Sequence, residues 1–123
     1  MTDEYVQDLD PKVRREIARR VLAKRSLIAF TQRFLPNYKP GWVHYDIARR
    51  LEQFTRDVEL ELSPRLMLLV PPRHGKSELG SIRWPGWTLG HHPEWEFINC
   101  GYNVDLPMKF SRKVRAMLRE QSY

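Results

Sequence analysis

The chain has 123 residues and a formal net charge of +6, and 41% of its residues are hydrophobic. This length accommodates one domain, and no apolar run approaches the ~20 residues of a membrane-spanning helix. The single cysteine, Cys100, excludes an internal disulfide and a cysteine-based metal cluster. The N-terminus, Met1-Thr2-Asp3-Glu4, lacks the apolar core of a secretory signal. The positive charge favours a polyanionic partner without specifying which one.

Residues 1–25 predict a basic helical arm. Asp10 is a suitable N-cap acceptor and Pro11 suits the first helical turn, so a helix is expected to begin there. Apolar residues recur along it at helical spacing, namely Val13, Ile17, Val21 and Leu22. The basic residues of this arm are Lys12, Arg14, Arg15, Arg19, Arg20, Lys24 and Arg25. They form either a docking face for DNA or another partner, or an ordinary solvated helix surface.

Two more helices are expected before residue 60. Residues 26–35 predict a short helix that Pro36 stops, with Leu27, Phe30 and Phe34 facing the core. After a turn at 37–41, a longer helix is expected from about His44 to Glu59. Its apolar face carries Ile47, Ala48, Leu51, Phe54 and Val58.

The apolar run at 66–70 predicts a buried strand at about 65–70, and a helix is expected to begin near Lys76. A strand, a tight loop with Gly75-Lys76-Ser77 and a helix form the setting of a phosphate-binding loop. The start of such a helix offers unpaired N–H groups and the positive end of its dipole. Lys76 would reach the β- and γ-phosphates, and the Ser77 hydroxyl would bind Mg²⁺.

This loop departs from the usual pattern, because Val70 stands where the first glycine is expected. Pro71 and Pro72 have no backbone N–H, so the phosphate-facing donors must come from residues 73–77. Gly75 allows the backbone to approach phosphate closely. The alternative is an ordinary strand-to-helix turn in which Lys76 is merely exposed.

Beyond the loop, the helix contains Pro85, which predicts a kink, and Gly90 and Pro93 should end it. A second strand is expected at about 96–101, with Cys100 as a buried thiol. A last helix should follow, capped by Asn103 or Asp105, with Phe110, Val114, Met117 and Leu118 on one side. Trp84, Trp87 and Trp95 are predicted core residues. The predicted fold class is therefore α/β: a partial P-loop NTPase with a parallel strand–loop–helix–strand sheet, preceded by an N-terminal helical region.

The stretch from Pro71 to Leu79 closely resembles the ATP-binding loop of the large terminase subunit of tailed bacteriophages. That family lacks the first glycine in the same way and carries an arginine inside the loop. Further segments similar to the family occur in order at 35–38, 42–44, 84–93, 102–106 and 110–115. The likeness covers residues 26–123.

Large terminase subunits are motors that push phage DNA into an empty capsid, and they join an N-terminal ATPase to a C-terminal nuclease. The resemblance implies only the first part of the ATPase here, with a basic arm at 1–25 and an incomplete P-loop ATPase domain at 26–123. A strand ending in Asp-Glu and the nuclease carboxylates are not in the sequence, so negligible hydrolysis is expected. The implied cofactors are ATP and Mg²⁺. Implied partners are double-stranded phage DNA, the small terminase subunit, the portal protein and further copies of the full-length chain, in the host cytoplasm and away from membranes.

The resemblance also implies roles for single residues. Arg73 and Lys76 would be catalytic, with Arg73 stabilising the γ-phosphate or, alternatively, pairing with a surface carboxylate. Nucleotide would be bound by Arg73, His74, Gly75, Lys76, Ser77 and Glu78, with Ser77 also on Mg²⁺. Trp42 and His44 lie where related motors keep an adenine-contacting segment. The alternative is packing, with Trp42 in the core and His44 as a helix N-cap.

Other functions stay open at this point. The chain could be a non-catalytic remnant that binds DNA or a partner protein, or a fragment of another P-loop NTPase such as a helicase or kinase relative. The missing first glycine and the terminase-like segments argue against the latter. Two parallel strands alone make a poor sheet, so open edges, exposed apolar surface and self-association are expected.

Overall fold

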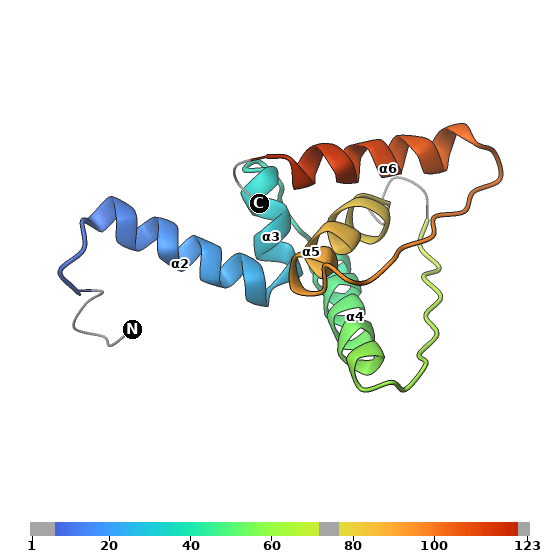
Figure 1. Cartoon of the computed structure of the whole chain (residues 1–123), viewed down its shortest axis with the longest axis horizontal. Coiled ribbons are helices and arrows are strands. Elements are labelled where there is room, and N and C mark those ends of the chain that lie inside the picture. The colour runs from blue at the N-terminus through green and yellow to red at the C-terminus, as the bar shows by residue number, and fades with distance from the viewer. Residues whose placement is uncertain (1–6, 72–76, 121–123) are drawn as a thin grey trace.

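The computed structural model describes residues 7–71 and 77–120. In chain order, its elements are α2 (Pro11–Arg25), α3 (Leu27–Phe34), α4 (Trp42–Glu59), the π-helix η1 (Glu78–Arg83), α5 (Trp84–His91) and α6 (Asp105–Leu118). Figure 1 shows α3, α4 and α5 gathered together, with α6 lying along one side of this group and α2 projecting away from it. Within the described ranges, none of the helices combines the length and the apolar character needed to span a membrane.

The predicted α/β fold is wrong, because the described residues form helices and contain no β-strand or sheet. The two expected strands, 65–70 and 96–101, are instead non-helical connections that lead out of α4 and α5 (Figure 1). Both segments have the apolar side chains of a strand. A strand is stable, however, only where a neighbouring strand satisfies its backbone groups, and these two do not pair.

The absence of the second strand from the described residues also changes the environment of Cys100. It was expected to be a buried thiol in the second strand, but it is exposed. Ile98, two residues earlier, is 90% exposed. Phe97, on the other face of the segment, meets the Trp84 ring edge to face with 5.3 Å between centroids. Without a sheet, the face that carries Ile98 and Cys100 stays uncovered.

The predicted helices at the N-terminal side are confirmed, with their ends close to the expected positions. Asp10 caps α2, because its Oδ1 accepts a hydrogen bond of 2.7 Å from the Lys12 N–H. Ser26 ends α2 and caps α3 through its Oγ, which accepts from the Ala29 N–H at 3.3 Å. The Leu27 N–H donates to Oε1 of Glu52 at 2.9 Å, so a side chain of α4 also binds the start of α3.

Pro85 is accommodated by a change of helix type. The turn that precedes α5 is the π-helix η1, in which the Trp84 N–H donates to the Leu79 carbonyl five residues earlier. A π turn is wider than an α turn, and π turns occur mostly as local bulges within helices. This widening relieves the crowding that a proline ring creates against the preceding turn. The helix ends at His91, between the predicted terminators Gly90 and Pro93.

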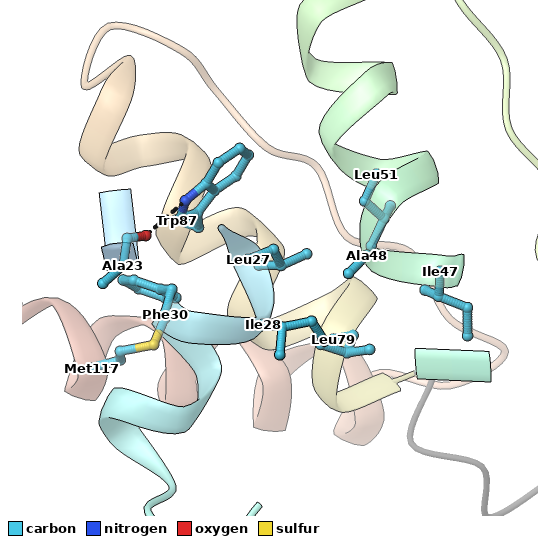
Figure 2. Close-up of a cluster of buried hydrophobic side chains, with 10 residues drawn as sticks. All are labelled: Ala23, Leu27, Ile28, Phe30, Ile47, Ala48, Leu51, Leu79, Trp87 and Met117. Atoms are coloured by element: carbon cyan, nitrogen blue, oxygen red, sulfur yellow. Dashed lines mark hydrogen bonds between the residues drawn. The ribbon is translucent and has the colours of Figure 1, made fainter. Parts of the chain in front are cut away.

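The hydrophobic core lies where α3, α4, η1 and α5 meet (Figure 2). Leu27 and Leu79 are completely buried at its centre. The Trp87 Nε1–H donates to the Ala23 carbonyl at 3.1 Å, which fixes α5 to the end of α2 (Figure 2). Trp87 is therefore a core residue as predicted, whereas Trp84 and Trp95 are only half-buried. The whole cluster comprises Ala23, Leu27, Ile28, Phe30, Ile47, Ala48, Leu51, Leu79, Trp87 and Met117.

A histidine joins the C-terminal ends of α4 and α5. His92 Nε2 lies 2.7 Å from Oε1 of Glu59, and its Nδ1 lies 3.2 Å from Oε1 of Glu94. Its ring stacks on Trp95 with 3.9 Å between centroids and 7° between planes. Only an imidazolium can donate from both nitrogens. The hydrogen bond to Glu59, above all, raises the pKa of His92 above its ordinary value of 6.5.

This bridge predicts that the chain becomes less stable as the pH rises. Because the folded pKa of His92 lies above 6.5, the bridge contributes fully below that value and is lost as the pH rises through the folded pKa. The pair is partly exposed, so the loss should not exceed about 1 kcal/mol. Urea unfolding at a series of pH values from acid to weakly alkaline would measure it. Glu59→Gln should flatten this dependence, and an equal slope in both proteins would contradict the assignment.

Candidate nucleotide-binding site

The predicted site divides into a part that the structure describes and a part that it does not. Arg73, His74, Gly75 and Lys76 lie outside the described residues, so their predicted roles stay predictions. Ser77 and Glu78 are described, and they begin the helical run that continues through η1 and α5. The remaining candidates, Trp42 and His44, lie in the first turn of α4.

Ser77 has helical backbone angles and is exposed. It lines a cavity of about 340 Å³ between α4, the 65–70 segment and η1. The other lining residues are Leu51, Phe54, Leu66, Leu68, Gly80, Ser81 and Trp84. The walls are thus largely apolar with two serine hydroxyls, a composition typical of small-molecule pockets.

The aromatic wall of this cavity is held in place by a hydrogen bond and a ring contact. Trp84 donates from Nε1 to Thr55 Oγ1 at 2.9 Å. Its ring meets Phe54 edge to face, with 5.6 Å between centroids and 83° between planes. Because Thr55 is buried, this bond fixes η1 and α5 against α4. The element that presents Ser77 is therefore firmly attached to the core.

Glu78 is occupied by an ion pair inside the protein. Its Oε1 accepts from Arg83 Nε at 2.8 Å, and the Arg83 side chain is only 12% exposed. The Arg83 guanidinium also lies 5.5 Å from the centre of the Phe34 ring and contacts Met117 Sδ at 3.1 Å. Glu78 thus anchors the start of η1, and its negative charge would repel phosphate rather than bind it.

Trp42 and His44 behave differently from each other. Trp42 is 83% exposed, so the alternative that it packs in the core is wrong. The alternative that His44 is the helix N-cap is also wrong, because Gly41 is the N-cap residue of α4. His44 is the third residue of the helix, and its Nδ1 accepts a hydrogen bond of 2.8 Å from the Gly41 N–H. The adenine-contacting role predicted for both residues stays a prediction.

Tyr38 is a residue of this region that sequence reasoning did not single out. Its ring meets the His44 ring edge to face, with 5.8 Å between centroids and 74° between planes. Its hydroxyl oxygen is buried and has no hydrogen-bond partner. Burial, and then the negative charge of Glu78, raise the pKa of Tyr38. In the sequence it is only an aromatic residue in a turn, and no local pattern signals that its oxygen is buried.

Ser77 is the described residue to which the sequence assigns a role in binding Mg²⁺, and that role stays a prediction. Within the described residues there is no group of three or more His, Cys, Asp or Glu side chains that could hold a metal ion. Mg²⁺ in nucleotide sites keeps water and phosphate oxygens as most of its ligands, so one hydroxyl suffices from this part of the protein. Ser77 is exposed and carries such a hydroxyl.

No family model, curated protein or solved structure matches this chain. The resemblance to the large terminase subunit therefore depends on its motif residues alone. For that reason the activity and partners it implies enter below as proposals.

Proposed function

We propose that this chain binds ATP with Mg²⁺ through residues 71–77, as the ATP-binding N-terminal portion of a phage terminase large subunit. One observation carries the proposal. Gly75-Lys76-Ser77 leads directly into a helix, and the exposed Ser77 at its start lines a cavity next to the core. This loop-to-helix arrangement supports phosphate binding without a neighbouring sheet.

The physical support comes from the helix start. Six residues of η1 and eight of α5 follow Ser77 in one helical run. The first N–H groups of a helix have no partner within it, and together with the helix dipole they favour an anion. Lys76 adds a full positive charge next to them. A polyphosphate with its Mg²⁺ would accept hydrogen bonds from these N–H groups and pair with the charge of Lys76.

The proposal concerns binding rather than rapid turnover. Phosphoryl transfer needs a group that orients the attacking water, besides the lysine and the metal. Glu78, the acidic residue next to the loop, is paired with Arg83 and stands on the far side of Ser77 from Lys76. Arg73 can stabilise charge on the γ-phosphate but cannot act as a base. The chain would therefore hold ATP and hydrolyse it negligibly.

The proposed partner is double-stranded phage DNA, bound in the host cytoplasm together with the portal protein, the small terminase subunit and further copies of the chain. The position and the positive charge of helix α2 support the proposal of a polyanionic partner. It projects from the other helices (Figure 1). Its seven lysine and arginine residues are all exposed: Lys12, Arg14, Arg15, Arg19, Arg20, Lys24 and Arg25. The same surface supports the alternative function, a chain that binds DNA and no nucleotide.

Titration with a fluorescent ATP analogue in the presence of Mg²⁺ tests the proposal. Lys76→Ala should weaken binding about ten- to hundredfold, because it removes a charged hydrogen-bond donor to phosphate. Lys109→Ala, which removes an exposed lysine from α6, should leave the affinity unchanged.

Equal affinity of the wild-type chain and Lys76→Ala would contradict the proposal. If the chain bound duplex DNA with an affinity that falls steeply with salt, but bound no nucleotide, the DNA-binding alternative would replace it.

A further inference from the structure

A second cavity, of about 320 Å³, lies between α5, α6 and the segment that joins these two helices (Figure 1). Ser81 lines both this cavity and the one at Ser77, so the two adjoin each other. Aliphatic side chains of α5 and α6 form part of its lining, and the described lining residues include no acidic side chain. Its volume falls within the range of small-molecule pockets, roughly 300–1,000 Å³. The cavity can therefore hold a single planar ring system.

Two aromatic residues of the joining segment, Trp95 and Phe97, line this cavity. The Trp95 ring stacks on His92, and the Phe97 ring meets Trp84 edge to face, so both rings are held in place. Phe97 is 37% exposed, which leaves part of its surface open to a ligand. Rings that are already fixed lose little freedom when an aromatic ligand stacks on them. This side of the cavity thus suits a planar aromatic group.

Three arginines of α6 follow the rim of the cavity. Arg115 is one of the lining residues. Arg112 and Arg119 stand three residues before it and four after it, so they lie on the same side of the helix. All three are exposed, and no described carboxylate forms an ion pair with any of them. A ligand that matches this rim carries several negative charges in a row.

The polar part of the lining adds groups that can pair with the edge of a base. Asn99 supplies an amide and Ser111 a hydroxyl, each able to donate and to accept. A nucleic acid strand combines a planar ring with polar edges and a row of phosphates. In a duplex the bases are paired and stacked, so a base enters a pocket only after it is flipped out. A single strand presents its bases without that cost.

We propose that this cavity and the three arginines beside it bind single-stranded nucleic acid. One unstacked base enters the cavity against Phe97, and the neighbouring phosphates lie along Arg112, Arg115 and Arg119. Stacking accepts any base, because every base has a π face, so binding should depend little on sequence. The site consists of described residues only and does not rest on the proposed ATP binding. It also differs from the duplex partner proposed above, because it needs a base that is free of its stack.

Binding of a fluorescein-labelled oligothymidine strand to the full chain, followed by anisotropy, tests the proposal. Phe97→Leu keeps an apolar side chain but removes the ring. It should weaken binding about fivefold, the lower end of the effect of losing one stacked base. Arg115→Gln should weaken binding about three- to tenfold. It should also reduce the slope of log affinity against log salt by about 0.7, the value for one phosphate contact to a single strand.

Two controls separate the base from the charge. Lys113→Gln removes one positive charge from the opposite side of α6, two residues before Arg115, and should leave the affinity nearly unchanged. An abasic strand of the same length should bind Phe97→Leu and the wild-type chain equally well. Unchanged binding of oligothymidine by Phe97→Leu would overturn the proposal, as would equal effects of Arg115→Gln and Lys113→Gln. Because Arg115 is exposed, its replacement leaves the core intact and reports on binding alone.

Titration with duplex DNA distinguishes this site from the basic helix α2. Phe97→Leu should leave the affinity for duplex unchanged, since no unstacked base is available there. Equal weakening of duplex and single strand would overturn the proposal. A wild-type chain that binds no oligothymidine would overturn it too, whereas the proposed function is decided separately by the titration with ATP and Lys76→Ala.

Discussion

Leu79→Ala should lower the free energy of unfolding by about 2–5 kcal/mol, the cost of removing a buried leucine and leaving a cavity. Leu79 is completely buried in η1 and belongs to the core cluster with Leu27 and Ile28 (Figure 2). The surroundings cannot collapse easily into the space, because Trp84 is tied to Thr55 and Arg83 to Glu78 on either side. A loss of this size is a large part of the roughly 5–15 kcal/mol that stabilises a domain.

Leu69→Ala is the matched control for this prediction. It is the same substitution at a side chain that is 86% exposed, so its effect should stay within about 0.5 kcal/mol. Urea unfolding followed by tryptophan fluorescence measures both variants. Equal effects of the two substitutions would mean that η1 does not pack on the core as described.

The second large effect concerns self-association. Met67, Leu69 and Ile98 are 78%, 86% and 90% exposed, and all lie on the two non-helical segments that were expected to be strands. Burying such surface yields ~25 cal/mol per Å², so contact between these segments of two copies is favourable. Neither segment forms a β-ladder within the described residues, so another chain can add a strand beside it. The purified chain should therefore form larger species as its concentration rises.

Replacing Met67, Leu69 and Ile98 together by lysine should weaken this association more than about tenfold, because a loss of only 1.4 kcal/mol corresponds to a factor of ten. Sedimentation velocity over a range of concentrations measures it. A control with lysine at Gln32, Asn37 and Ser111 adds the same charge at exposed polar positions. If both triple variants dissociated equally, net charge and not the apolar segments would control association.

Local features of the sequence were sufficient to predict the helices. The cap at Asp10 and Pro11 depends on atoms within a few residues, and the structure shows the α2 helix beginning there. The apolar spacing that includes Ile47 and Leu51 likewise identified the buried face of α4. Helical hydrogen bonds join residues four apart, so this information is present in any short stretch.

Local sequence features could not decide whether the two apolar segments pair into a sheet. A strand is stabilised by partners that are distant in sequence, and the apolar residues at 65–70 indicate a preference without showing that a partner is adjacent. The same limit explains Cys100, whose predicted burial depended on that sheet and whose side chain is exposed. For the candidate site, the roles that the sequence assigns to residues 73–77 stay predictions.

By itself, then, the sequence determined the helices at the N-terminal side and the cap of α2 at Asp10, because each depends on neighbouring residues. Only the tertiary structure decided that 65–70 and 96–101 do not pair and that the Tyr38 oxygen is buried without a partner. Burial and pairing of this kind arise where elements far apart in the chain meet, and no local pattern encodes them.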